Sequence, residues 1–207
     1  MFQDLSSLME LTEIPARGPS PSFDRAHLLL TFMVIGSSGT IGRGALAKRV
    51  GLGEGAVRTV LKRLRDGRYA QVDASGCHLT ASGLSVYRAL GRELSDPLRL
   101  DDSHLTLGRA QIALVVRGAA RLVKKGLEQR DSAVRAGAVG ATTYVVKRGK
   151  FVIPDGSNDC EADFPGPAWA TLRSTLKPRE GDAVVLCGSS DETSATLGAL
   201  SAALTLI

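Results

Sequence analysis

Apolar positions in the first half of the chain recur at helical spacing and predict a series of short helices. An apolar run at 28–35 follows Asp24, a residue that can cap a helix. A second helix is expected at 44–50, ended by Gly51-Leu52-Gly53, and a third at 54–66. The apolar side chains of the third helix fall on one stripe, formed by Val57, Val60, Leu61 and Leu64.

A β-hairpin and a fourth helix are predicted next. Residues 69–73 and 77–80 flank Ala74-Ser75-Gly76, a short turn between two strand-like segments. Thr80 can cap the fourth helix, whose apolar side chains are Leu84, Val86, Tyr87 and Leu90. The region from Asp24 onward therefore has the order helix, helix, helix, hairpin, helix.

The second half of the chain predicts a compact α/β domain with a mixed sheet. Strands are expected at 111–116 and 182–187, a hairpin at 142–153, and helices at 118–136, 168–176 and 191–204. The long helix 118–136 carries a stripe that we expect to be buried, formed by Ala120, Val123, Leu127 and Val134. The predicted fold class is therefore α+β, with a helical N-terminal domain that contains a hairpin and a small α/β domain after it.

Polar segments rich in proline and aspartate separate these regions. Residues 15–22 predict a lead-in loop, and residues 154–167 predict a surface loop of the second domain. The segment 95–103 interrupts two well-patterned regions, and we place the domain boundary there. The prediction is thus one domain over residues 1–95 and another over residues 104–207.

Composition changes this picture little but limits the chemistry. Of 207 residues, 43% are hydrophobic and 23% are charged, which suits one or two domains with solid cores. Because no apolar stretch approaches the roughly 18 residues that span a bilayer, and no secretory signal is recognisable, a cytoplasmic protein without membrane contact is expected. Three scattered cysteines and three histidines form no metal-binding pattern, so neither a metal ion nor any other cofactor is expected.

The helices at 44–50 and 54–66 have the spacing of a helix-turn-helix. Ala47 is small enough for the second helix to cross over it, and the angle between the two helices is expected to be filled by Val50, Leu52, Val57 and Val60. Burying that stripe turns the remaining side chains of the pair outward. Those expected to reach phosphates and guanine edges are Arg43, Lys48, Arg49, Gly55, Arg58, Thr59, Lys62 and Arg63.

Basic residues concentrate on this helix pair. Residues 43–68 contain eight Lys or Arg residues against two acids, whereas the whole chain has 26 against 21. Since an evenly solvated surface mixes both signs, the excess favours a polyanionic partner, here double-stranded DNA. The hairpin would be the wing, although its tip at 73–77 has no Lys or Arg. A winged helix that docks on protein or binds RNA is the other interpretation.

A different hypothesis starts from the glycine-rich segment 34–42. An apolar run followed by G-x-x-G-x-x-G resembles the phosphate loop of short-chain dehydrogenase-like nucleotide-binding proteins. The second apolar strand ending in an acid, expected about 20 residues later, is missing. The alternative is a loop between two helices, with Thr40-Ile41 as a short strand beside the hairpin.

The C-terminal domain offers two places for a small anionic effector. At 188–191 a strand runs into a helix start that could hold an anion, or Ser190 or Asp191 could simply cap the helix. Arg130 or Asp131 falls on the expected buried stripe and needs an internal salt bridge or a ligand. The candidate ligand-binding residues are Arg117, Arg130, Asp131, Ser189 and Ser190. No catalytic residue is expected, because no nucleophile–base pair or carboxylate pair is recognisable.

Residues 43–83 resemble the winged-helix domain of the central glycolytic genes regulator type. They end in Leu79-Thr80-Ala81-Ser82-Gly83, which is similar to the L-T-x-x-G signature at the end of the wing in many winged-helix regulators. The layout from about residue 24 to 207 is similar to a family of archaeal two-domain proteins of unassigned role, through V-R-G-A-A at 116–120, G-L-E-Q-R-D at 126–131, G-A-T-T at 140–143 and G-A-L at 198–200. The resemblance implies a DNA-binding N-terminal domain and supplies no activity.

These observations predict a transcriptional regulator with a C-terminal domain for effector sensing or dimerisation. Because one recognition helix covers only a few base pairs, a homodimer is expected. The Ala-rich helix at 191–204 is apolar around most of its circumference, so we expect it to be buried in its own domain or against a partner's copy. The other hypothesis is an enzyme or sensor of a small phosphorylated or nucleotide ligand with an accessory winged helix.

Overall fold

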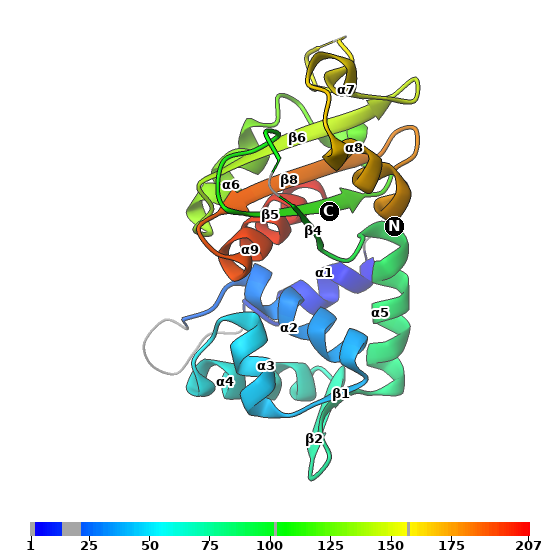
Figure 1. The fold of residues 1–207 in the computed structure, drawn as a ribbon. Helices are drawn as coiled ribbons and strands as arrows, with labels where there is room; N and C mark the ends of the chain where they lie inside the picture. The colour runs from blue at the N-terminus through cyan, green and yellow to red at the C-terminus, as the bar shows by residue number, and fades with distance from the viewer. Residues whose placement is uncertain (1–2, 14–21, 102, 157) are drawn as a thin grey trace. The chain divides into compact units, whose positions relative to one another are not determined.

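The computed structural model describes residues 3–13, 22–101, 103–156 and 158–207 (Figure 1). The chain divides into two compact units, the first ending at Gly91 and the second beginning at Arg92. The architecture is α+β, with a small three-stranded sheet among helices in the first unit and a five-stranded sheet with helices in the second. The lead-in loop expected at 15–22 lies outside the described residues, apart from Ser22.

The N-terminal unit has the expected order of helices and hairpin, with one additional helix at its start. Its sheet has the order β1-β3-β2, and both neighbouring pairs are antiparallel. The elements are α1 (Gln3–Glu10), α2 (Arg25–Ser38), β1 (Thr40–Ile41), α3 (Arg43–Val50), α4 (Glu54–Asp66), β2 (Ala70–Asp73), β3 (Gly76–Leu79) and α5 (Ala81–Glu93).

Helix α2 forms the centre of this unit. Asp24 caps it by accepting a hydrogen bond from the backbone N–H of His27, as expected. Every residue from 28 to 35 is buried, and α2 packs against α1, α3, α4, β1 and β3. The apolar run is thus helix where a nucleotide-binding loop requires a strand, so the phosphate-loop hypothesis is wrong. Thr40-Ile41 is the short strand beside the hairpin, which confirms the alternative.

Hydrogen bonds and a close backbone contact explain the L-T-x-x-G segment, which joins the hairpin to α5. Leu79 is buried, and the Thr80 hydroxyl accepts a hydrogen bond from the Gly83 N–H, which confirms its role as the cap of α5. A Cβ atom at Gly83 would lie 2.0 Å from the carbonyl oxygen of Tyr69, so only glycine fits there. That carbonyl also accepts a hydrogen bond from the Thr80 N–H.

The C-terminal unit is built on a sheet of order β4-β5-β8-β6-β7 in which all neighbouring strands are antiparallel. Its strands are β4 (Leu98–Leu100), β5 (Ala110–Val116), β6 (Gly140–Lys147), β7 (Lys150–Val152) and β8 (Ala183–Ser189). The helical segments are η1 (Ala120–Leu122), α6 (Leu127–Arg135), α7 (Cys160–Asp163), α8 (Pro167–Thr171), η2 (Leu172–Leu176), α9 (Glu192–Ala203) and η3 (Leu204–Leu206).

The expectation of a mixed sheet is therefore wrong. Strands β5 and β6 run in the same direction, as a strand–helix–strand unit requires. They are not neighbours, because β8 lies between them and runs the opposite way (Figure 1). The segment 95–103, taken from the sequence as the domain boundary, contains β4, which pairs with β5.

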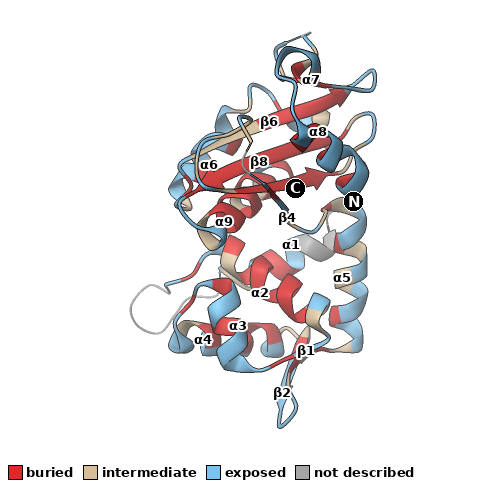
Figure 2. Cartoon of the chain, in the orientation of Figure 1, coloured by how far each residue is buried: buried red, intermediate tan, exposed pale blue. Residues whose placement is uncertain are grey.

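Both faces of this sheet are covered, so its central strands are buried along most of their length (Figure 2). Helices α6 and α9 pack on one face. On the other face Trp169 contacts Tyr144 and Phe151, with ring centroids 5.2 and 4.9 Å away. Helix α9 is buried almost entirely against β5, β8 and α6 of its own unit, which decides between the two options left open for it.

The prediction of one long helix at 118–136 is wrong. A 3-10 turn ends at Leu122, and α6 begins only at Leu127, after Gly126 with φ 76°. That left-handed conformation favours glycine and interrupts a continuous helix. The interruption changes which residues of α6 face the sheet. Gln129 and Ala133 are buried, whereas Leu127 and Val134 of the expected buried stripe are exposed.

Candidate nucleic-acid interface

The tight turn between α3 and α4 positions the surface on which most predicted site residues lie. Gly51 ends α3 with φ 68°, and its N–H donates to the carbonyl of Ala47. Val50, Val57 and Val60 are buried in the angle between the two helices, as the sequence predicts. Packing this side of α4 inward leaves its opposite side in solvent.

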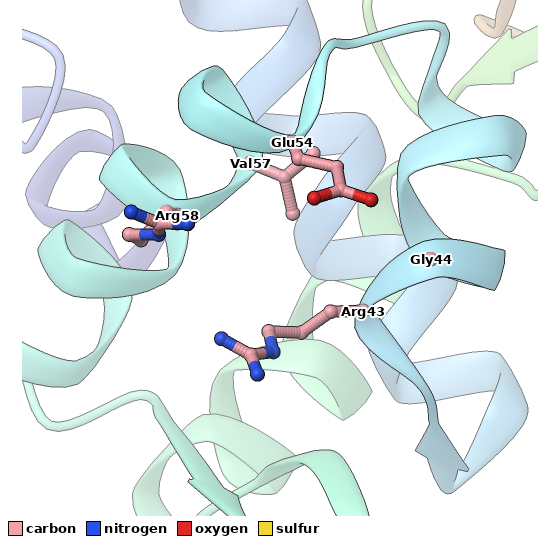
Figure 3. Close-up of a pocket in the computed structure, with 5 residues that line it drawn as sticks. All are labelled: Arg43, Gly44, Glu54, Val57 and Arg58. Atoms are coloured by element: carbon pink, nitrogen blue, oxygen red, sulfur yellow. The ribbon is translucent and has the colours of Figure 1, made fainter.

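Two adjoining hollows of about 380 and 360 Å³ lie over α3 and α4. Arg43, from the start of α3, and Arg58, from α4, line both hollows. Figure 3 shows Arg43, Arg58 and the Glu54 carboxylate around the first hollow. We call this pair of hollows the basic groove. The remaining residues that line it are Gly44, Glu54, Val57, Thr59, Leu61, Lys62, Arg65 and Val72.

The cations of the basic groove differ in how far the protein itself neutralises them. Lys62 Nζ lies 2.6 Å from the Asp66 carboxylate, and this hydrogen bond holds the pKa of Asp66 below its ordinary value of 3.8. Within the described ranges of the chain, Arg43 and Arg58 have no ion-pair partner. These two guanidinium groups are therefore available to an anion from outside.

The structure brings only part of the predicted set to the groove. Arg43, Arg58, Thr59 and Lys62 line it. Gly55 is exposed on the first turn of α4, and Lys48 and Arg49 are exposed on the last turn of α3. Arg49 donates a hydrogen bond of 2.9 Å to the Ser38 hydroxyl.

Arg63 corrects the prediction, because it points into the protein and is only 6% exposed. Its Nη1 group donates to the backbone carbonyls of Leu11 and Thr12, at 2.9 Å each. Its guanidinium carbon also lies 5.0 Å from the ring centroid of Phe23. Arg63 thus ties the segment after α1 to α4, and that segment had not been expected to fold against it.

Among the lining residues that the sequence analysis did not assign to the site are Arg65 and Val72. Arg65 lies three residues after Lys62 and seven after Arg58, so helical spacing alone places it on the same face of α4. Val72 lies on β2 and reaches the groove because the hairpin follows α4 directly. Only the packing of the hairpin could reveal this second contribution.

The hairpin tip is acidic and rigidly hydrogen-bonded. Asp73 accepts hydrogen bonds from the Ser75 hydroxyl and N–H, at 2.5 and 2.8 Å, and these hydrogen bonds lower its pKa. His78 Nδ1 lies 3.8 Å from the same carboxylate. The tip therefore offers no cation of its own, in line with its sequence.

The candidate ligand-binding residues of the C-terminal unit do not form one site. Arg117 follows Val116, which pairs with Ala183, whereas Ser189 pairs with Ala110 at the other end of the same two strands, about 20 Å away at the usual rise per residue. Arg117 binds the buried carboxylate of Asp182 at 2.8 Å and two backbone carbonyls. These contacts give it a structural role in its own unit.

The remaining candidates also have local roles or lie in solvent. Ser189 is buried and donates to the carbonyl of Gly137, while Ser190 is exposed. Asp191 caps α9 by accepting from the Ser194 N–H, which confirms the capping interpretation. Arg130 and Asp131 are exposed, so the expectation that one of them is a buried charge is wrong.

Within the described ranges, no three His, Cys, Asp or Glu side chains come together as metal ligands would. The same ranges contain no helix that combines the length and the apolar character of a membrane span. All three cysteines are buried and unpaired, and burial raises the pKa of the Cys187 thiol to about 12.

Comparison with known proteins identifies a protein of similar fold but indicates no activity. No curated protein matches the chain. The chain is similar in structure to the hypothetical protein PH0730 from Pyrococcus horikoshii OT3, with a TM-score of 0.73 and 24% identity over 89% of this chain and 93% of that chain. That likeness establishes a fold shared with an archaeal protein. Residues 107–206, most of the C-terminal unit, match the family model of a domain of unknown function, DUF4443.

Proposed function

We propose that the N-terminal unit is a winged helix-turn-helix domain that binds double-stranded DNA, and that the chain is a transcriptional regulator. The observation that carries the proposal is the basic groove. Two guanidinium groups line one hollow and have no ion-pair partner within the described residues, and a phosphate backbone would neutralise both. Seven exposed Lys or Arg residues lie between residues 43 and 68, against the two acids Glu54 and Asp66.

Helix α4 has the properties of a recognition helix. Arg58, Lys62 and Arg65 lie four and three residues apart, so they form one ridge on the side away from the buried valines. A major groove about 12 Å wide admits one such helix. Gly55 lowers helix stability by up to about 1 kcal/mol relative to alanine, although a Cβ there would meet nothing within 4 Å. Close approach of DNA to the first turn of α4 would account for a glycine at this position.

Different roles are proposed for the two neighbouring cations on this ridge. Arg58 has no ion-pair partner in the described residues and a planar fork of donors, which suits a bidentate contact with guanine. Lys62 already shares its charge with Asp66 and is a compact point charge, which suits a phosphate. The hairpin β2–β3 would act as the wing by forming one wall of the groove through Val72 rather than through a cation at its tip.

A salt titration of DNA binding by the full-length protein tests the proposal. The slope of log K against log salt concentration should be negative, with about −0.9 for each phosphate neutralised. Competition between duplex DNA and RNA of the same sequence separates DNA recognition from RNA binding. A slope near zero, or stronger binding of RNA, would remove the DNA hypothesis.

Three alanine variants test the assignments within the ridge. Arg58→Ala should cost about 1–3 kcal/mol on the preferred sequence and relax the base preference. Lys62→Ala should weaken binding to all sequences alike and make the salt slope shallower by about one unit. Arg88→Ala, which removes an exposed arginine from α5, is the matched control and should change neither quantity. If Arg58→Ala weakens specific and random DNA equally, Arg58 contacts phosphate instead.

A further inference from the structure

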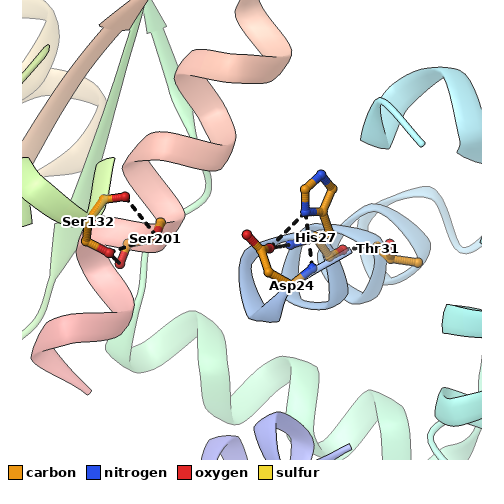
Figure 4. Close-up of polar contacts among 5 residues, drawn as sticks. All are labelled: Asp24, His27, Thr31, Ser132 and Ser201. Carbon is orange, nitrogen blue, oxygen red and sulfur yellow. Dashed lines mark hydrogen bonds and ion pairs between the residues drawn. The ribbon is translucent and has the colours of Figure 1, made fainter. Parts of the chain in front are cut away.

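Helix α6 presents two different faces, and only one of them is explained by its own unit. Its inner face is tied to α9 and the turn after it: Gln129 donates to the Thr205 hydroxyl at 2.6 Å. The hydroxyls of Ser132 and Ser201 lie 2.8 Å apart between α6 and α9 (Figure 4). These hydrogen bonds and the buried Ala133 fix the rotation of the helix about its axis.

The outer face that results is partly apolar. Leu127 and Val134 are 54% and 45% exposed, and since they lie seven residues apart they fall on nearly the same line along the helix. Leu122 and Val139, in the segments just before and after α6, are 52% and 57% exposed. Single exposed apolar side chains need no explanation, but four within one short stretch of chain indicate a covered surface.

Two opposite charges flank the apolar line of α6. At about 100° per residue, Arg130 lies about 60° to one side of Leu127, and Asp131 lies about 40° to the other side. Both charged side chains are exposed. Farther round on the Asp131 side lie the exposed Glu128 and Arg135, about 100° and 80° from Leu127, and their charges cancel. The outer face therefore has one basic edge, at Arg130, and one edge of net negative charge, at Asp131, with an apolar line between them.

We propose that this outer face of α6 is the contact between two copies of this chain, with the two α6 helices packed side by side and parallel. A twofold axis parallel to both helices places the basic edge of one copy against the acidic edge of the other. Arg130 then meets the partner's Asp131, and this happens twice in each dimer. Leu127 and Val134 meet their own counterparts near the axis, as a self-complementary contact requires.

The charges select this occupant and this direction over others. If the two helices ran antiparallel, each edge would face the same edge of its partner, so like charges would meet. A polyanion such as DNA would be repelled by Asp131, and an acidic or basic protein surface would leave one edge facing a like charge. Of these occupants, a second copy in the parallel arrangement is the one that satisfies both edges at once.

The dimer can be tested without DNA, so the result does not depend on the proposed function. Sedimentation equilibrium of the full-length protein across the micromolar range should show a mass of two chains. Asp131→Arg places basic residues on both edges and should raise the dissociation constant about tenfold or more. The double variant Arg130→Asp with Asp131→Arg exchanges the two edges and should restore the dimer.

Asp155→Arg is the matched control, because it makes the same charge change at an exposed position outside α6 and should leave the mass unchanged. Circular dichroism shows whether each variant remains folded, and these exposed substitutions are expected to keep the fold. A mass of one chain for the unaltered protein would overturn the proposal. An Asp131→Arg variant that dimerises like the parent, or a double variant that stays monomeric, would overturn it as well.

Discussion

Arg63 has a structural role, unlike the exposed arginines near it in the sequence that we propose bind DNA. Its guanidinium group donates to the carbonyls of Leu11 and Thr12, which follow the last residue of α1. Carbonyls at the end of a helix have no partner within the helix, and a cation there also suits the helix dipole. Arg63 therefore caps α1 from another part of the chain, and we predict that Arg63→Met undocks this cap.

The size of the effect follows from these contacts. Hydrogen bonds to a charged group contribute about 1.5–3 kcal/mol each, and the contact with the Phe23 ring about 0.5–2 kcal/mol. Desolvation of the buried guanidinium offsets part of this sum. In the variant, water can reach the two carbonyls once the end of α1 moves away, which limits the loss. We therefore expect the free energy of unfolding to fall by about 2 kcal/mol.

Urea denaturation of the full-length protein measures this loss, and Arg65→Met is the matched control. Arg65 is exposed and lines the basic groove, so its replacement should change stability by less than about 0.5 kcal/mol while weakening DNA binding. Arg63→Met should show the reverse pattern: its free energy of unfolding should be lower, and its affinity for DNA should be unchanged under conditions in which the variant is folded. An Arg63→Met variant that is as stable as the parent, or that is folded but binds DNA poorly, would refute this reasoning.

Two further predictions concern the start and end of the N-terminal unit. Gly83→Ala should lower stability by about 3 kcal/mol or more, because the new Cβ would lie 2.0 Å from the Tyr69 carbonyl oxygen; thermal unfolding showing a stability equal to the parent's would contradict the close contact. Asp24→Ala should cost about 1 kcal/mol at neutral pH through loss of the helix cap. Since the hydrogen bond with His27 lowers the pKa of Asp24 below 3.8, this difference should be present above that pH and fade as the pH falls through the lowered pKa; a difference that is independent of pH between 2 and 7 would show that the carboxylate charge is not involved.

Local sequence patterns predicted the elements of the N-terminal unit well, because each has a strong signal of its own. The apolar stripe predicts residues 54–66 as a helix, and α4 spans Glu54–Asp66. Asp24 and Thr80 cap the helices that follow them. Four predicted residues line the groove, since spacing along a helix fixes which side chains share a face. Arg63 was misassigned because its partners are carbonyls of the segment just after α1, a helix that the hydrophobic pattern did not reveal.

Relations between distant segments were decided by the tertiary structure. The sequence determined the presence of a last strand at 182–187. Its insertion between β5 and β6, which makes the sheet antiparallel, depends on which strands it pairs with. The sequence likewise predicted an apolar stripe on a helix at 118–136, with Arg130 or Asp131 falling on it. Which way that stripe faces depends on Gly126, where the helix restarts, and on hydrogen bonds to α9 nearly 70 residues away. A periodic pattern determines which residues share a face; only the packed neighbours determine whether that face is turned inward.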